Sequence, residues 1–259
     1  MRNSVGAILA AVLIGACTSP GSPSHPERTS PRLSESVSFV EGPVTVRLSA
    51  EASKAAEDSN VDLTSLMRAA IRDVSRRLDL RKTRVSVRVS PKRTIRSAGV
   101  GGFTDPVTGR VALSLDPDHP KFDRVLQVWL PATVAHELHH SVRIKRGPGY
   151  GETLLEAIVT EGLAQVFSRE VVADAPILPD AVSGPAVCRL WADARRESRV
   201  GAYDHYAWFF GTQEIPKWTG YTLGHELIQS YLVRRPPESA ASLVECPARM
   251  IISEAGFCR

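Results

Sequence analysis

Several features that often reveal function are missing from this sequence of 259 residues. It contains no internal repeat, and its glycine-rich stretch at 99–102 has neither the GxGxxG nor the GxxxxGK[ST] spacing that holds phosphates. Charged residues make up 23%, too little for a disordered chain, while hydrophobic residues at 43% can build a sizeable core. Length and composition therefore predict one large folded domain, with or without a helical extension.

Aromatic residues are absent where positive charge gathers. Residues 61–96 hold eleven Lys or Arg against three Asp and contain no Phe, Trp or Tyr. A nucleic-acid interface needs aromatic side chains on which bases can stack, so the composition argues against a nucleic-acid partner. A solvated basic face is the favoured interpretation, and attraction to anionic lipid or cell-wall polymer is the alternative.

A short hydrophobic run opens the chain. It covers residues 5–14 and is followed by two small residues and Cys17. The run is too short for a permanent membrane span and predicts a signal peptide at residues 1–16. The segment ending at Cys17 resembles a bacterial lipobox, with an ordinary signal peptide as the alternative. We expect an exported lipoprotein, held at the outer face of a cell membrane by a lipid on Cys17 and a Ser/Pro-rich tether at 17–42.

Cysteines are few. Beyond Cys17 the chain has Cys188, Cys246 and Cys258, which allows one disulfide in an oxidising compartment. Cys246 and Cys258 bracket a short C-terminal segment, so we expect these two to pair and Cys188 to be a buried thiol.

Hydrophobic periodicity predicts an α+β fold with a small N-terminal sheet and a mostly helical C-terminal part, in a folded domain at 43–259. Alternating residues predict strands at 44–48, 84–90 and 110–115, with a helix at 61–79. The glycine-rich stretch at 99–109 is expected to be a loop, and the strand at 110–115 an edge strand to which an extended peptide can add. Helices are expected near 131–145, 152–170, 186–199, 203–210 and 218–234.

The stretch HELHH at 136–140 contains an HExxH motif. On a helix, His136 and His140 lie one turn apart on one face, where both imidazoles can bind one zinc ion. Glu137 lies beside them, where its carboxylate can take a proton from a water molecule as general base. His139 points away from Glu137, so we expect it behind the ligands or at the surface.

A catalytic zinc takes three protein ligands, so the two histidines need a partner. The extension HExxHxxGxxH is absent, because positions 143 and 146 are Arg. The following helix offers Glu152, Glu156 and Glu161. Glu152 lies at the helix start, where a carboxylate caps. Glu161 lies among apolar neighbours and most needs a buried partner, but helical geometry alone leaves Glu156 open.

HELHH, followed by TLLEAIVTEGLAQVF and IPKWTGYTLGHELIQSYL, resembles the bacterial predicted zinc-dependent proteases, a domain-of-unknown-function family with HExxH and a downstream EGLA glutamate. The resemblance covers roughly residues 100–235. It implies a zincin-like fold with the gluzincin-like arrangement of thermolysin-type peptidases. In that arrangement His136, His140 and Glu161 bind Zn²⁺ and Glu137 is the base. The resemblance implies no particular substrate.

Tyr221 and His225 follow in the last of these segments, and either can donate a hydrogen bond to the oxyanion of a hydrolysed peptide bond; Tyr221 is our choice. We therefore predict a zinc peptidase that cleaves peptide or protein substrates within the chain. The alternatives are a non-catalytic zinc-containing binding lipoprotein and a zinc amidase acting on cell-wall peptides. Glu137 favours an enzyme, because a structural zinc prefers four protein ligands and needs no base.

Overall fold

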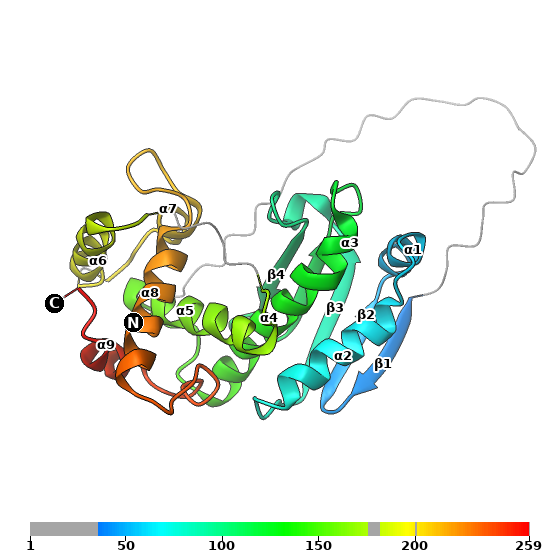
Figure 1. Ribbon diagram of the computed structural model, residues 1–259, viewed down its shortest axis with the longest axis horizontal. Coiled ribbons are helices and arrows are strands. Elements are labelled where there is room, and N and C mark those ends of the chain that lie inside the picture. Colours follow the sequence, from blue (N-terminus) through cyan, green and yellow to red (C-terminus); the bar gives the residue numbers. More distant parts are fainter. Residues whose placement is uncertain (1–35, 176–181, 200, 259) are drawn as a thin grey trace, which may run out of the picture. The chain divides into compact units, whose positions relative to one another are not determined.

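A five-stranded sheet with helices on one face forms the frame of the folded domain (Figure 1). The computed structural model describes residues 36–175, 182–199 and 201–258. The compact unit that contains these residues extends from position 34 to 259. The predicted signal peptide, Cys17 and the tether up to residue 35 lie outside the described residues.

The sheet contains parallel and antiparallel strands. They are β1 (Val37–Glu41), β2 (Val44–Leu48), β3 (Thr83–Val89), β4 (Val100–Thr104) and β5 (Val111–Leu115), in the order β1-β2-β3-β5-β4. β2, β3 and β5 are parallel neighbours, whereas β1 and β4 pair antiparallel at the two edges. Two helices connect β2 to the parallel β3, which confirms the predicted β-α-β start.

Helices make up most of the chain after β5, as predicted. The helices are α1 (Ala50–Asp58), α2 (Leu63–Ser75), α3 (Phe122–Arg124), α4 (Leu130–Arg146), α5 (Leu154–Val171), α6 (Pro185–Glu197), α7 (His205–Phe210), α8 (Thr219–Arg234) and α9 (Ala248–Ala255). A π-helical turn at Val125–Trp129 leads into α4. Among the described residues, no helix has the length and apolar character needed to cross a membrane.

Alternation along the strands decides which face of the sheet is covered. Val44, Val46 and Leu48 of β2 are fully buried, whereas Thr45 and Arg47 between them are exposed. Successive side chains of a strand point to opposite faces, so one face is apolar and the other polar. α1, α2 and α4 pack on the strands from the apolar side.

Three expectations about the sheet are wrong. β4 forms within the predicted loop at 99–109, because pairing with β5 outweighs the low strand preference of its glycines. β5, predicted as an edge strand, is internal, and β4 is the edge. β1 lies in the predicted tether and pairs with β2, so the folded domain begins before residue 43.

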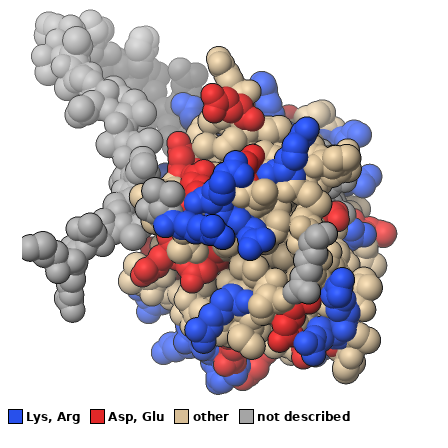
Figure 2. Space-filling view, turned by 90° about the vertical axis from the view of Figure 1, so that its left-hand side faces the viewer, with Lys and Arg blue, Asp and Glu red and all other residues tan. Residues whose placement is uncertain are grey.

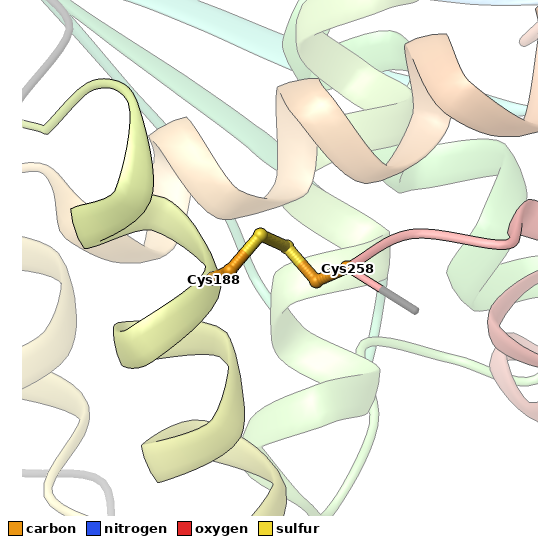
Figure 3. Close-up of a disulfide and its surroundings, with 2 residues drawn as sticks. All are labelled: Cys188 and Cys258. Atoms are coloured by element: carbon orange, nitrogen blue, oxygen red, sulfur yellow. A yellow bond between two sulfur atoms is a disulfide. The ribbon is translucent and has the colours of Figure 1, made fainter.

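The disulfide joins Cys188 on α6 to Cys258 after α9 and leaves Cys246 free (Figure 3). The predicted Cys246–Cys258 pair and the predicted Cys188 thiol are therefore wrong. α9, with eight residues, lies between Cys246 and Cys258. A helix of that length spans about 12 Å, whereas the Cα atoms of a disulfide lie within about 7 Å of each other. The bond instead ties the C-terminal end of the chain to α6.

α5 and α8 cross at two glycines and so come unusually close. A Cβ atom added to Gly162 would lie 2.8 Å from the Cα of Gly224, and one added to Gly224 would lie 3.0 Å from the Cα of Gly162. Real side chains do not tolerate such contacts, so both positions need glycine. This crossing brings side chains of α8 next to those of α5 on both sides of Gly162.

Basic and acidic side chains are mixed on the side of the domain formed by the C-terminal helices. Figure 2 shows this side, with Lys and Arg interspersed among Asp and Glu. The ion pair that joins Arg235, after α8, to Glu254 of α9 is partly exposed to solvent. Exposed pairs add little stability, so the buried contacts of α5 and α8 hold this part of the fold.

Candidate metal centre

Two histidines of α4 and one glutamate of α5 converge on a common point. The Nε2 atoms of His136 and His140 lie 2.9 Å apart, and their rings meet edge to face at 83°. Glu161 Oε2 lies 3.1 Å from His136 Nε2 and 3.4 Å from His140 Nε2. Three possible ligand atoms from two packed helices therefore lie together, as the HExxH spacing and the downstream glutamate predict.

The spacing of these atoms fits a tetrahedral zinc ion. Zinc binds histidine nitrogen and carboxylate oxygen at about 2.0–2.2 Å, which places neighbouring ligand atoms roughly 3.3 Å apart. The separations of 2.9, 3.1 and 3.4 Å are close to that value. Two imidazoles and one carboxylate also match the His₂Glu donor set of catalytic zinc, which leaves a fourth position for water.

Local sequence explains why Glu161, and not Glu156, reaches the histidines. Glu156 accepts the backbone N–H of Thr153 at 2.9 Å, and the Thr153 hydroxyl accepts the N–H of Glu156, so the two form a capping box. Glu152 lies before α5 and also donates its N–H to Glu156. The carboxylate of Glu156 is therefore used in hydrogen bonds at the start of α5. Glu161 lies more than one turn further along and takes no part in those bonds, so its carboxylate can face the histidines.

Tyr150, in the turn between α4 and α5, also belongs to the site, and it was not among the predicted site residues. Its hydroxyl donates to Glu161 Oε1 at 2.6 Å, which leaves Oε2 of Glu161 for the histidines. Burial, together with the charge of Glu161, raises the pKa of Tyr150 well above its usual value, so the hydroxyl keeps its proton. The contact depends on how α5 packs against α4, so the residue types of the turn alone do not reveal it.

Electrostatics keep Glu161 ionised. Burial alone would raise its pKa, but the positive charge and hydrogen bonds of His140 and His136 hold the pKa of Glu161 well below its usual range. Burial lowers the pKa of His136, but its hydrogen bond with Glu161 and the charge of that carboxylate reverse the effect and raise it. A raised pKa means that His136 holds its proton more strongly. A metal cation must displace that proton when it binds, so metal affinity should fall at acidic pH.

Glu137 lies beside the cluster and is held by the edge strand β4. The Thr104 hydroxyl donates to Glu137 Oε2 at 2.6 Å, and the Glu137 side chain is buried. Gly102 of β4 lies against the same side chain, because a Cβ atom added there would be 2.7 Å from Glu137 Cδ. The backbone of β4 thus approaches the predicted base as closely as it can.

A cleft of about 120 Å³ opens beside this group, and His136 and Glu137 line one part of it. Tyr221 and His225 of α8 line the cleft as well. Burial, with the charges of Glu161 and Glu137, raises the pKa of Tyr221 well above its usual value, so this hydroxyl is also a proton donor. The two residues predicted as oxyanion donors therefore both border the space next to the cluster.

His139 takes no part in the cluster. Its Nε2 lies 3.2 Å from the carbonyl oxygen of Ala240, and its ring packs on Phe167 at 5.2 Å between centroids. The side chain is fully buried, and this burial lowers the pKa of His139 well below its usual value, so it is neutral. His139 was expected behind the ligands or at the surface, and the structure places it in the core.

Fold and site together define a protein with a His₂Glu group, a neighbouring carboxylate and a cleft, carried by two helices packed beside a mixed sheet. Residues 63–253 match the family described as predicted Zn-dependent protease (DUF2268), and the chain belongs to this family. The match runs from α2 into α9 and so includes every residue of the site. A comparison with curated proteins finds no match to the chain.

Proposed function

We propose that the protein is a peptidase of zincin-like architecture that hydrolyses peptide bonds within a chain, with His136, His140 and Glu161 as zinc ligands. The observation that carries this proposal is the carboxylate of Glu137, buried beside three convergent ligand atoms at a cleft. A purely structural zinc site does not need an additional carboxylate that does not bind the metal and lies at an opening to solvent. The family to which the chain belongs supports the same activity.

The chemistry divides between the metal and the residues around it. Zn²⁺ at this site would supply a Lewis acid that polarises the scissile carbonyl and makes water more acidic. Glu137 accepts a proton from the water whose oxygen bonds to the carbonyl carbon. It then returns that proton to the amide nitrogen as the C–N bond breaks, so that an amine and a carboxylic acid leave. Thr104 orients Glu137 for both transfers through its hydrogen bond.

Two tyrosines assist the reaction in different ways. Tyr150 fixes Glu161 through the 2.6 Å hydrogen bond, so that one carboxylate oxygen is always turned to the histidines. Tyr221 borders the cleft with a protonated hydroxyl and is the proposed donor to the oxyanion that develops on the carbonyl. His225 borders the same cleft and is the alternative donor.

We propose that the substrate backbone adds to β4. Ile95 donates its N–H to the carbonyl of Val100 on the outer side of β4, at 2.9 Å. Backbone groups of a strand alternate between its two sides, so those of Gly102 point outward too. Gly102 is exposed and lies next to Glu137. A peptide paired there by main-chain hydrogen bonds would pass in front of the base.

We also propose that the protein works outside the cytoplasm, anchored by a lipid on Cys17. The Cys188–Cys258 disulfide supports export, because such bonds persist in oxidising compartments. Mass spectrometry of the intact protein purified from membranes tests this point. A mass that corresponds to a chain beginning at a diacylated Cys17 is expected, and an unmodified cysteine there would contradict the anchor.

Metal analysis and hydrolysis assays on the full-length, processed protein test the function. About one zinc per chain is expected, together with cleavage of a peptide library by the wild type. Glu137→Gln should keep the zinc and lose roughly 10³-fold in kcat. Zinc binding without any hydrolysis would favour the binding lipoprotein, and cleavage confined to cell-wall peptides would favour the amidase. A protein that binds no zinc after repletion would refute the proposal.

A further inference from the structure

Gln165 presents an unsatisfied amide to the cleft. It lies on α5, one turn beyond Glu161, and its side chain lines the cleft while only 9% of the residue is exposed. Neither its Nε2 nor its Oε1 finds a hydrogen-bond partner among the described residues. Buried polar atoms are nearly always paired, and an exception at a cleft indicates that a ligand provides the missing partners.

His225 brings a second unpaired polar atom to the same space. It lines the cleft from α8, its side chain is 12% exposed, and its Nδ1 lies 3.7 Å from Glu226 Oε1. Its Nε2 is buried without a partner in the described part of the chain. The close crossing of α5 and α8 at Gly162 and Gly224 packs these two helices together beside the cleft.

Arg169 adds a positive charge one further turn along α5. It is exposed and lines the cleft, and the described residues contain no ion pair between Arg169 and a carboxylate. Arg169 also touches an adjacent hollow that Arg124 and Asp174 border, and no ion pair joins Asp174 to Arg169 in the described part of the chain. Among the described residues that line the cleft, Glu137 is the only one with an acidic side chain, and it lies next to the candidate metal ligands. The end of the cleft that lies away from the candidate metal ligands therefore carries the positive charge of Arg169.

Resting on the proposed peptidase function, we propose that Gln165, His225 and Arg169 form a subsite for a substrate residue that carries a carboxylate. An amide can both accept an N–H and donate to a C=O, so Gln165 matches a peptide group of the substrate. His225 Nε2 adds one further hydrogen bond. Arg169 then binds the carboxylate with its guanidinium, which suits that planar group better than any other side chain.

The carboxylate can come from two sources. One is the side chain of an Asp or Glu inside the substrate, and the other is the C-terminal carboxylate of the peptide. Both offer the same planar anion to Arg169. The two sources predict different cleavage patterns. Recognition of the C-terminal carboxylate would restrict cleavage to peptide bonds near the end of the substrate, whereas recognition of an Asp or Glu side chain would not.

Peptide binding and cleavage by the full-length, processed protein test the subsite. The probes are fluorescent peptides that differ in one position, Glu or Gln, each with a free or an amidated C-terminus. Binding is measured by anisotropy in a Glu137→Gln background, and cleavage in the wild-type background. We expect one carboxylate source to improve binding about tenfold, equivalent to about 1.4 kcal/mol. A preference for internal Glu identifies the side chain, and a preference for the free C-terminus identifies the chain end.

Two variants and a matched control complete the test. Arg169→Gln should abolish the carboxylate preference without weakening the neutral, amidated peptide. Gln165→Met, which keeps the side-chain length but removes both polar atoms, should weaken all four peptides about equally. Arg124→Gln removes a neighbouring charge that does not line the cleft. This variant should change neither the carboxylate preference nor the affinity for the neutral peptide.

The outcomes separate the subsite from the peptidase function. Cleavage without any carboxylate preference, or a preference that survives Arg169→Gln, would overturn the subsite and leave the peptidase intact. Selective binding that depends on Arg169, without cleavage of any peptide, would support the subsite and overturn the peptidase. Absence of both binding and cleavage would overturn both proposals.

Discussion

Replacing Gly102 by alanine should separate catalysis from stability and from metal binding. A Cβ atom there would lie 2.6 Å from Cγ and 2.7 Å from Cδ of Glu137. Carbon atoms in contact are normally about 3.5–4.0 Å apart, so the glutamate side chain must move by about 1 Å. It is long and flexible, so the move should cost only about 1 kcal/mol of folding free energy. A displacement of this size can nevertheless reduce kcat about 10²-fold.

The assay for Gly102→Ala combines three measurements. Zinc content and thermal unfolding should stay near wild type, while kcat for a fluorogenic peptide falls. Phe103→Ala is the matched control, because Phe103 is the next residue of β4 and its side chain, 59% exposed, points to the opposite face of the sheet. A wild-type kcat in Gly102→Ala would refute the role of Glu137 as base. Equal losses in both variants would mean that β4 was disturbed as a whole.

Three further predictions concern the ligand helix and the disulfide. Glu161→Ala should abolish zinc binding measured by mass spectrometry, whereas Glu156→Ala should keep the zinc and cost about 1 kcal/mol of unfolding free energy through loss of the capping box. Tyr150→Phe should weaken zinc affinity roughly 10-fold to 100-fold in a chelator competition, because Glu161 loses the partner that orients it; unchanged affinity would contradict this role. Cys188→Ser should lower the unfolding free energy by about 4 kcal/mol in denaturant titrations, given a loop of 70 residues; a change below about 1 kcal/mol would contradict it.

The sequence predicted the parts of the site that depend on helical geometry. His136 and His140 converge because residues four apart share a helix face, which requires nothing beyond the helix itself. The choice between Glu156 and Glu161 was also within reach, since Thr153 followed three residues later by Glu156 is the pattern of a capping box. A glutamate used at the helix start is not free to bind a metal.

What the sequence did not predict depends on contacts between distant segments. β4 contains two glycines and forms only because β5 pairs with it, which no local pattern encodes. The disulfide partner of Cys258 depends on where α6 packs, so nearness in sequence favoured Cys246 wrongly. The role of Tyr150 likewise depends on how α5 returns along α4, and a turn-forming sequence does not show which side chain will face inward.

The arrangement of α5 links these observations. Glu161, Gln165 and Arg169 follow one another at intervals of four residues. The proposed metal ligand is therefore spaced about 6 Å along the helix axis from an amide, and that amide about 6 Å from a guanidinium, neither of which has a partner among the described residues. An extended peptide advances about 3.3 Å per residue, so for the part of the substrate that would extend along α5 each interval corresponds to about two substrate residues. Because the Arg169 side chain can reach back toward the metal, the carboxylate that it binds should lie two to four residues from the scissile bond. In this proposal one helix both positions a zinc ligand and sets the distance between the scissile bond and the substrate carboxylate.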